Sequence, residues 1–235
     1  MSSRYANFAN RSVLDMNAAR MSLSLVACGT CRVDQTPARA ATDLWQAGGV
    51  TVAGILLAAG GGRRYGMAKA LVRYRGELFV ERAARVLRDA GCDPVIVVLG
   101  AAADQVRAQA DLTGVSTVDN PDWASGMGSS LRVGLTAVAN ADAAVILPVD
   151  TPGVTVAAVR RVIADAGPET LVRATYGGVP GHPVVIGRAH WAGVRELATG
   201  DAGAREYLRA HPPVDVPCAD VADGADVDRP EDLPG

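Results

Sequence analysis

An apolar segment, Thr51 to Ala59, runs directly into three consecutive glycines, Gly60 to Gly62. An apolar run of this length, bounded by glycines, is typical of a β-strand that is buried on both faces. Such strands occur in parallel sheets that are covered by helices on both sides. The segment therefore favours an α/β fold, with the glycine-rich loop at the carboxyl end of a central strand.

The rest of the chain alternates between apolar runs of strand length and segments with helical periodicity. We expect further strands at residues 94–99, 115–118, 143–149, 171–176 and 184–186, and helices at residues 78–90, 104–110, 129–139, 155–166, 189–198 and 202–210. This alternation predicts a three-layer α/β/α architecture with a mostly parallel sheet. Ligands of such sheets bind beyond the carboxyl ends of the strands.

Residues 1–49 differ from the rest, because they carry scattered polar residues and small side chains without sustained periodicity. We predict that they form an N-terminal extension, flexible or not part of the native start, and that residues 50–235 form the folded domain. The C-x-x-C pair Cys28 and Cys31 has no second pair to complete a zinc site, so we interpret it as incidental.

Net charge and hydropathy argue against nucleic acid and membranes as binding partners. The 235 residues carry a formal net charge of −2, which gives no bulk electrostatic attraction for nucleic acid or a membrane surface. No apolar run approaches the roughly 20 residues needed to span a bilayer, and we expect a cytoplasmic protein. Any polyanionic ligand must therefore be bound by a local site.

The glycine-rich loop has the composition of a phosphate-binding site. Glycines let backbone N–H groups converge on phosphate oxygens, and Arg64 and Lys69 follow as a planar fork and a mobile point charge. A Walker A loop is excluded because Lys69 precedes Ala70 rather than Ser or Thr. A dinucleotide-binding fingerprint is excluded because Tyr65 stands where its third glycine is required.

Two later features complete a candidate site. Asp150 follows the apolar strand 143–149, where its carboxylate would face the crevice at the strand end and suit a magnesium ion. Asn120 ends an earlier strand, and Ser129 and Ser130 are placed to cap the next helix, whose first amides attract phosphates or hydroxyls. The three histidines and the serines form no hydrolase triad.

Several blocks of the chain resemble the molybdenum cofactor nucleotidyltransferases. The loop reads Leu57-Ala-Ala-Gly-x-Gly-x-Arg64-x-Gly66-x-x-Lys69, with Tyr65 where the family usually has methionine. The segment Asn120-Pro-Asp-Trp-Ala-Ser-Gly-Met-Gly-Ser-Ser-Leu-Arg-Val-Gly134 is similar to a second family block. Later blocks are Gly181-His-Pro-Val184, Gly200-Asp-Ala-Gly-Ala-Arg205 and Asp226-Val-Asp-Arg-Pro-Glu-Asp-Leu233. Together they span the chain from about residue 52 to its end, in the family's order.

The resemblance implies a Rossmann-like nucleotidyltransferase fold and a set of site residues. It implies Mg²⁺ as the cofactor, held by Asp150 and by Asp228, and contacts to the acceptor from His182 and Asp201. Arg64, Lys69 and Asp150 are the implied catalytic residues. The implied nucleotide-binding residues are Leu57, Ala58, Ala59, Gly60, Gly61, Gly62, Arg64, Lys69, Asn120, Ser129 and Ser130.

The expected reaction transfers CMP from CTP to the phosphate of molybdopterin and releases pyrophosphate. Ala58-Ala59 at the loop entrance resembles the cytidylyl branch of the family, whereas the guanylyl branch typically has Ala-Gly there. GTP as the donor, a different phosphate acceptor, and a non-catalytic module that holds the cofactor for a molybdenum-dependent apoenzyme stay open as alternatives.

Overall fold

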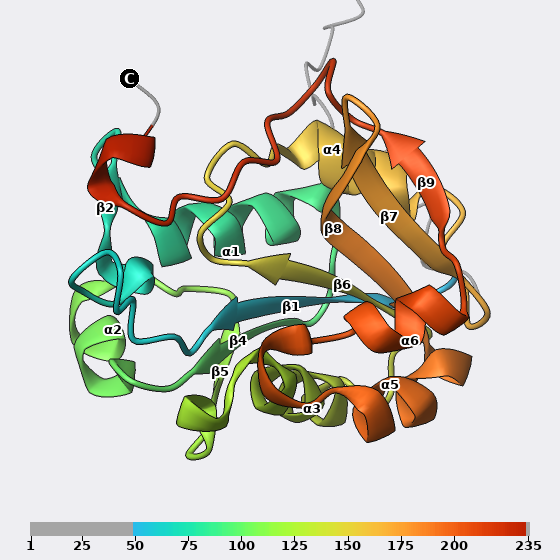
Figure 1. Cartoon of the computed structure of the whole chain (residues 1–235), viewed down its shortest axis with the longest axis horizontal. Helices are drawn as coiled ribbons and strands as arrows, with labels where there is room; N and C mark the ends of the chain where they lie inside the picture. Colours follow the sequence, from blue (N-terminus) through green and yellow to red (C-terminus); the bar gives the residue numbers. More distant parts are fainter. Residues whose placement is uncertain (1–48, 234–235) are drawn as a thin grey trace, which may run out of the picture. The chain divides into compact units, whose positions relative to one another are not determined.

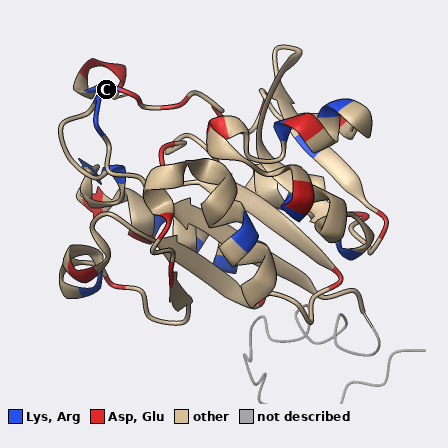
Figure 2. Ribbon diagram, turned by 60° about the horizontal axis from the view of Figure 1, so that its bottom comes forward, with Lys and Arg blue, Asp and Glu red and all other residues tan. Residues whose placement is uncertain are grey.

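The computed structural model describes residues 49–233, and these residues form a seven-stranded sheet with helices on both faces (Figure 1). The predicted extension, apart from Gly49, and the pair Cys28 and Cys31 lie outside the described residues. Within the described part, no helix is long and apolar enough to cross a membrane. Acidic and basic residues of this part are interspersed along the ribbon (Figure 2).

The sheet is mostly parallel, as the sequence predicts. Its spatial order is β5-β4-β1-β6-β8-β7-β9, and only β8 runs against its neighbours among these strands. The strands are β1 (Val52–Ala58), β4 (Val95–Leu99), β5 (Ser116–Asp119), β6 (Ala143–Pro148), β7 (Leu171–Tyr176), β8 (Val179–Gly187) and β9 (Val214–Pro217). The central strand β1 is paired in parallel with β4 and β6, so the carboxyl ends of these three strands share one edge.

Successive side chains of β1 enter two separate cores, because residues alternate between the faces of a strand. Leu56 and Ala58 pack in one core, and Ile55 and Leu57 pack in the other. The first core is covered by α1 (Phe79–Ala90), α2 (Ala103–Gln109) and α4 (Val156–Ile163). The second is covered by α3 (Met127–Ala137), α5 (Trp191–Leu197) and α6 (Arg205–Ala210). The three-layer prediction is therefore confirmed.

The structure adds elements that the apolar pattern did not reveal. A two-stranded hairpin, β2 (Arg73–Tyr74) and β3 (Glu77–Leu78), follows the glycine-rich loop, and β9 forms an edge of the sheet. Both are short and partly exposed, so they lack the long apolar runs on which strand prediction depends. The strand expected at 184–186 begins earlier, at Val179, because its first residues lie outside the core.

The chain after β9 returns to the carboxyl end of β6, as the red trace in Figure 1 shows. We call residues 218–228 the C-terminal strap. The backbone N–H of Cys218 donates to the Thr175 carbonyl at 2.9 Å, and the Thr155 hydroxyl donates to the Val221 carbonyl at 2.9 Å. The Val227 side chain is buried, and its N–H donates to the Asp150 carbonyl at 2.8 Å. The strap is thereby fixed beside the end of β6.

Candidate active site

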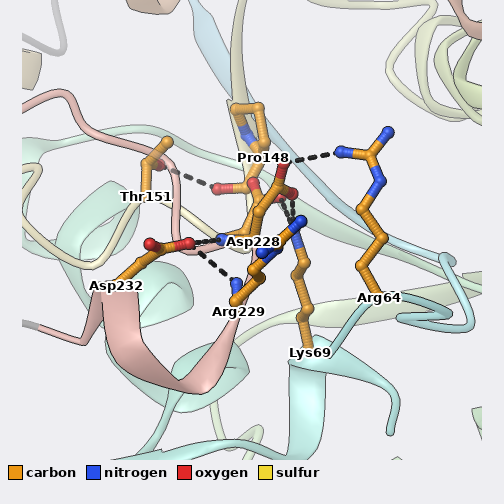
Figure 3. Close-up of polar contacts among 8 residues, drawn as sticks. Arg64, Lys69, Pro148, Thr151, Asp228, Arg229 and Asp232 are labelled. Atoms are coloured by element: carbon orange, nitrogen blue, oxygen red, sulfur yellow. Dashed lines mark hydrogen bonds and ion pairs between the residues drawn. The ribbon is translucent and has the colours of Figure 1, made fainter. Parts of the chain in front are cut away.

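Lys69 is at the centre of a charged cluster at the carboxyl edge of the sheet. It begins the short 3₁₀ helix η2 (Lys69–Leu71), whose next two residues, Ala70 and Leu71, are buried in the core under α1. This anchoring fixes the lysine backbone and directs its ammonium group at two carboxylates. The distances from Nζ are 2.8 Å to Asp150 Oδ2 and 2.6 Å to Asp228 Oδ1 (Figure 3).

The backbone brings the two carboxylates together from distant parts of the sequence. Asp150 follows β6, and the hydrogen bond from the Val227 N–H to its carbonyl places Asp228 beside it. The Asp228 and Arg229 amides then donate to Asp232 Oδ2 at 3.1 and 2.8 Å, which fixes the turn after Asp228 (Figure 3). Asp232 is a positioning residue beyond those predicted, although a carboxylate three residues after Arg229 is a recognisable cap.

Arg64 closes the cluster from the glycine-rich loop. Its Nη1 lies 2.7 Å from Asp228 Oδ2, and the side chain is 72% exposed, so the contact holds the arginine at the mouth of the site. The loop and the C-terminal strap therefore meet through two cations and one shared carboxylate. A phosphate-bearing ligand that enters the loop would find both cations already directed toward one point.

The charges within the cluster are mutually stabilised. Burial lowers the pKa of Lys69, but its hydrogen bonds and attraction to Asp150 and Asp228 outweigh this and raise the pKa overall. The hydrogen bond from Lys69 holds the pKa of Asp228 below its usual value, and Arg64 acts in the same direction. Lys69 is therefore protonated and Asp228 ionised at neutral pH, as phosphate and metal binding require.

The glycine-rich loop is closed on itself. Gly62 has a φ of 60°, and a Cβ there would lie only 1.8 Å from the Met67 carbonyl oxygen, so only glycine fits. The Gly66 N–H donates to the Gly62 carbonyl at 2.9 Å, which completes the turn before Lys69. A Cβ built on Gly60 meets nothing within 4 Å, and one on Gly61 would face the Trp123 ring at 3.5 Å. Gly60 therefore offers open backbone to a ligand.

Three predicted nucleotide-binding residues at the loop entrance have buried side chains. Leu57, Ala58 and Ala59 are each at most 8% exposed, and they alternate between the two cores. The Ala59 carbonyl accepts a hydrogen bond from the Ala101 N–H at 3.0 Å. Any contact of these residues with a nucleotide must come from the backbone, whose course their small side chains determine.

Asn120, Ser129 and Ser130 form a buried hydrogen-bonded unit. Asn120 Nδ2 donates to Ser129 Oγ at 2.8 Å and to Ser130 Oγ at 2.9 Å, and its Oδ1 accepts from the Asp122 N–H at 3.0 Å. All three side chains are at most 4% exposed. Gly126 is the N-cap of α3, which begins at Met127, so the prediction that the two serines cap this helix is wrong. They lie in its first turn, where their contacts with Asn120 fix the start of α3 against the end of β5.

His182, in β8, is close enough to Asp150 for the carboxylate charge to act on its imidazole ring. It is half-buried in β8, and its carbonyl accepts a hydrogen bond from the Tyr176 hydroxyl at 2.7 Å, which sequence analysis did not foresee. Burial lowers the pKa of His182 to about 4; the Asp150 charge opposes this shift and the Arg205 charge adds to it. The imidazole is therefore neutral at pH 7.

Asp201 is exposed in the 3₁₀ helix η5 (Gly200–Ala202), which packs against the start of α3. A Cβ at Gly126 would lie 2.4 Å from the Gly200 carbonyl carbon and 2.7 Å from Asp201 Oδ1, so glycine is required for this close approach. The predicted acceptor residues thus come from two separate elements, β8 and η5.

Two carboxylates of the cluster suit a divalent cation. No group of three or more histidine, cysteine or acidic side chains suited to hold a metal occurs within residues 49–233. Magnesium, however, needs only one or two protein carboxylates, because substrate phosphates and water complete its shell. Asp150 and Asp228 both direct an oxygen at the same ammonium group, so their donor chemistry and placement fit such an ion.

Comparison with known proteins identifies relatives across most of the described residues. Residues 54–216 match the family model described as MobA-like NTP transferase domain. The chain is 41% identical over 192 residues to nicotine blue oxidoreductase from Paenarthrobacter nicotinovorans, covering 77% of this chain and 94% of that protein. It is 51% identical over 47 residues to a probable molybdenum cofactor guanylyltransferase from Opitutus terrae, covering 20% of this chain and 23% of that protein.

Solved structures agree with this assignment. The crystal structure of Rv0371c from Mycobacterium tuberculosis H37Rv superposes with a TM-score of 0.67 and 33% identity, covering 78% of this chain and 95% of that one. A manganese complex of Rv0371c gives a TM-score of 0.60 over 72% of this chain and 88% of that one, again with 33% identity. With the family match, these show that the chain belongs to the MobA-like NTP transferase family and is an enzyme of the nucleotidyltransferase class.

Proposed function

We propose that this enzyme transfers CMP from CTP to the terminal phosphate of molybdopterin, the organic part of the molybdenum cofactor, and releases pyrophosphate. The observation that carries the proposal is the cluster of Lys69 and Arg64 with Asp150 and Asp228, next to open loop backbone at Gly60. At the carboxyl edge of the sheet, the two cations are suited to bind a triphosphate and the two carboxylates are suited to bind its metal ion.

In this reaction an oxygen of the acceptor phosphate attacks the α-phosphorus of CTP. A new phosphorus–oxygen bond forms, the bond between the α- and β-phosphates breaks, and pyrophosphate leaves with the electron pair. Both substrates are anions, so the first requirement is positive charge at fixed positions. Lys69 and Arg64 supply it from the loop. A magnesium ion held by Asp150 and Asp228 would add charge stabilisation to the phosphates.

The choice of CTP depends on the entrance to the loop. Ala58 and Ala59 match the cytidylyl branch, and their buried side chains indicate that they act by setting the course of the backbone. GTP is the alternative donor, and the similarity to the probable guanylyltransferase over 47 residues favours it. A sugar or alcohol phosphate is the alternative acceptor, because the phosphate-binding loop does not distinguish acceptors.

A second candidate function is a redox reaction. The relative named nicotine blue oxidoreductase is 41% identical over nearly its whole length, which favours testing this activity. The loop itself lacks the third glycine of a dinucleotide-binding fingerprint, since Tyr65 stands there. The test is to mix the protein with nicotine blue and a reduced nicotinamide cofactor, without any nucleoside triphosphate. Loss of the nicotine blue absorbance would support the redox reaction over nucleotidyl transfer.

Pyrophosphate release with CTP, GTP, ATP and UTP, each with magnesium and molybdenum-loaded molybdopterin, tests the proposal. We expect release with CTP, and mass spectrometry should detect the cytosine dinucleotide form of the cofactor. Equal use of all four triphosphates, or release only with a sugar phosphate, would refute the substrate assignment.

Two matched variants test the metal site. Asp150→Asn should lower the rate by roughly 10²–10³, the usual effect of losing one electrostatic element of this kind. Asp165→Asn is the control, because Asp165 follows α4, whose end lies at the opposite edge of the sheet from Asp150. Full transfer by Asp150→Asn, or equal losses in both variants, would refute the role of Asp150.

A further inference from the structure

Strand pairing places His182 of β8 at the carboxyl edge of the sheet. Val184 and Ile186 belong to the core under α3, α5 and α6, whereas Val185 belongs to the opposite core. The register of β8 against β7 shifts between Val184 and Pro180, so this alternation ends at Val184 and does not extend to His182. Because Val184 pairs antiparallel with Ile146 of β6, His182 lies toward the carboxyl end of β6, where Asp150 follows.

Arg205 belongs to α6, which packs on the same face of the sheet as α3, and its side chain is available to a ligand. It is the first residue of α6 and is exposed, and within residues 49–233 it makes no hydrogen bond or ion pair. Its charge acts on the His182 ring, as does the charge of Asp150, so the three groups are electrostatic neighbours. Arg132, by contrast, has its guanidinium bonded to the Ala198 carbonyl.

The segment before Arg205 is held tightly against α3. A Cβ at Gly128 would lie 2.5 Å from the Ala198 carbonyl oxygen, and one at Gly203 would lie 3.2 Å from Met127 Sδ. These close contacts fix the segment before α6 against the start of α3, which comes soon after the carboxyl end of β5. Arg205 therefore extends from a fixed position rather than from a free loop.

We propose that Arg205 binds the phosphate of the acceptor, on the side of Asp150 opposite to Lys69 and Arg64. This inference rests on the proposed transferase function and deepens it. Lys69 is anchored through Ala70 and Leu71 on the α1 face, whereas Arg205 begins α6, whose buried residues pack in the opposite core. Phosphoryl-group chemistry places the attacking and leaving oxygens roughly in line, so cations on opposite sides suit the two substrates.

The charge on the acceptor side supports this assignment. Asp201, which the sequence suggested for acceptor binding, is a carboxylate and would repel a phosphate. A second anion therefore needs a cation there, and an arginine offers a planar pair of donors that matches phosphate oxygens. Arg205 is the residue in the Gly200–Arg205 block that has this chemistry.

Arg205→Gln and Arg205→Lys test the inference, with Arg209→Gln as a matched control. Arg209 is on the same short helix, is also exposed, and has no hydrogen bond or ion pair in the described part of the chain. We expect Arg205→Gln to raise the KM for molybdenum-loaded molybdopterin by about 10- to 100-fold, the usual effect of one charge-assisted contact. The KM for CTP should stay within about twofold, Arg205→Lys should recover part of the loss, and Arg209→Gln should match the wild type.

A binding measurement separates this inference from the reaction itself. Each variant is equilibrated with molybdenum-loaded molybdopterin without nucleotide, and the free molybdenum is measured after ultrafiltration. Binding that depends on Arg205 without any transfer by the wild type would refute the reaction and keep the inference. If Arg205→Gln transfers CMP and binds the cofactor as well as the wild type does, or if Arg209→Gln shows the same losses, the inference is overturned and the reaction is kept. Failure of the wild type to bind the cofactor would refute both.

Discussion

Replacing Lys69 with methionine should have opposite effects on metal binding and on turnover. The ammonium group makes charge-assisted contacts of 2.8 and 2.6 Å with Asp150 and Asp228, and its side chain is only 14% exposed. Such contacts contribute about 1.5–3 kcal/mol each, and the 45% exposure of Asp228 reduces its share through solvent screening. A net stabilisation of about 2 kcal/mol follows for the cluster.

A divalent cation must compete with Lys69 for the same two carboxylates. Lys69→Met removes the competitor, so the variant should bind Mn²⁺ in the absence of nucleotide about 30-fold more tightly, which is 2 kcal/mol expressed as a ratio of dissociation constants. Transfer from CTP should nevertheless fall by roughly 10²–10³, because the lysine no longer stabilises charge on the phosphates.

Isothermal titration calorimetry with Mn²⁺ alone measures the first effect, and pyrophosphate release measures the second. Arg85→Met is the control, since it breaks an ion pair of 2.8 Å between Arg85 of α1 and Glu77 of β3, neither of which contacts the cluster. That variant should lose some stability without any change in metal affinity. Weaker or unchanged Mn²⁺ binding by Lys69→Met would refute the competition between lysine and metal.

Three further variants test how the site is supported. Asn120→Ala leaves the buried Ser129 and Ser130 hydroxyls without their amide partner and should lower the free energy of unfolding by about 1–3 kcal/mol, measured by urea denaturation. Gly224→Ala places a Cβ 2.1 Å from the Tyr176 ring, so it should displace the C-terminal strap and weaken Mn²⁺ binding; unchanged calorimetry would contradict this. His182 has a pKa of about 4, below its ordinary value of 6.5, so the unfolded chain binds its proton first and stability should fall as pH drops from about 6.5 to 4. His182→Gln should reduce that slope, and an unaltered pH profile of thermal unfolding would argue against a buried neutral imidazole.

The sequence carries strong information wherever a segment is buried on both faces. The apolar run at β1 and the glycines after it predicted the central strand and the loop, because a doubly covered strand leaves no room for polar residues. The hairpin β2–β3 and the edge strand β9 could not be predicted in this way, since half-exposed short strands resemble loops in composition.

The candidate site also contains residues that the strand pattern predicts and residues that it does not. The grouping of Lys69 with Asp150 depends on the carboxyl ends of strands sharing an edge, which the α/β pattern implies. Asp228 joins them through the C-terminal strap, whose Val227 N–H donates to the Asp150 carbonyl. The partners that hold the site, Tyr176 at the end of β7 and Asp232 in the short 3₁₀ helix η6 (Pro230–Asp232), act through individual hydrogen bonds, and periodicity gives no signal for such contacts.

The C-terminal strap contributes a residue to the candidate site but no strand to the sheet. Every strand of the seven-stranded sheet ends by Pro217, yet Asp228 follows on the strap. A chain shortened after β9 would keep the sheet and the glycine-rich loop but lose a carboxylate and the Val227 contact that places it. During synthesis, the proposed metal site would therefore be completed only after the strap has followed the last strand of the sheet. Proteolysis in this strap would switch off the chemistry without removing any strand.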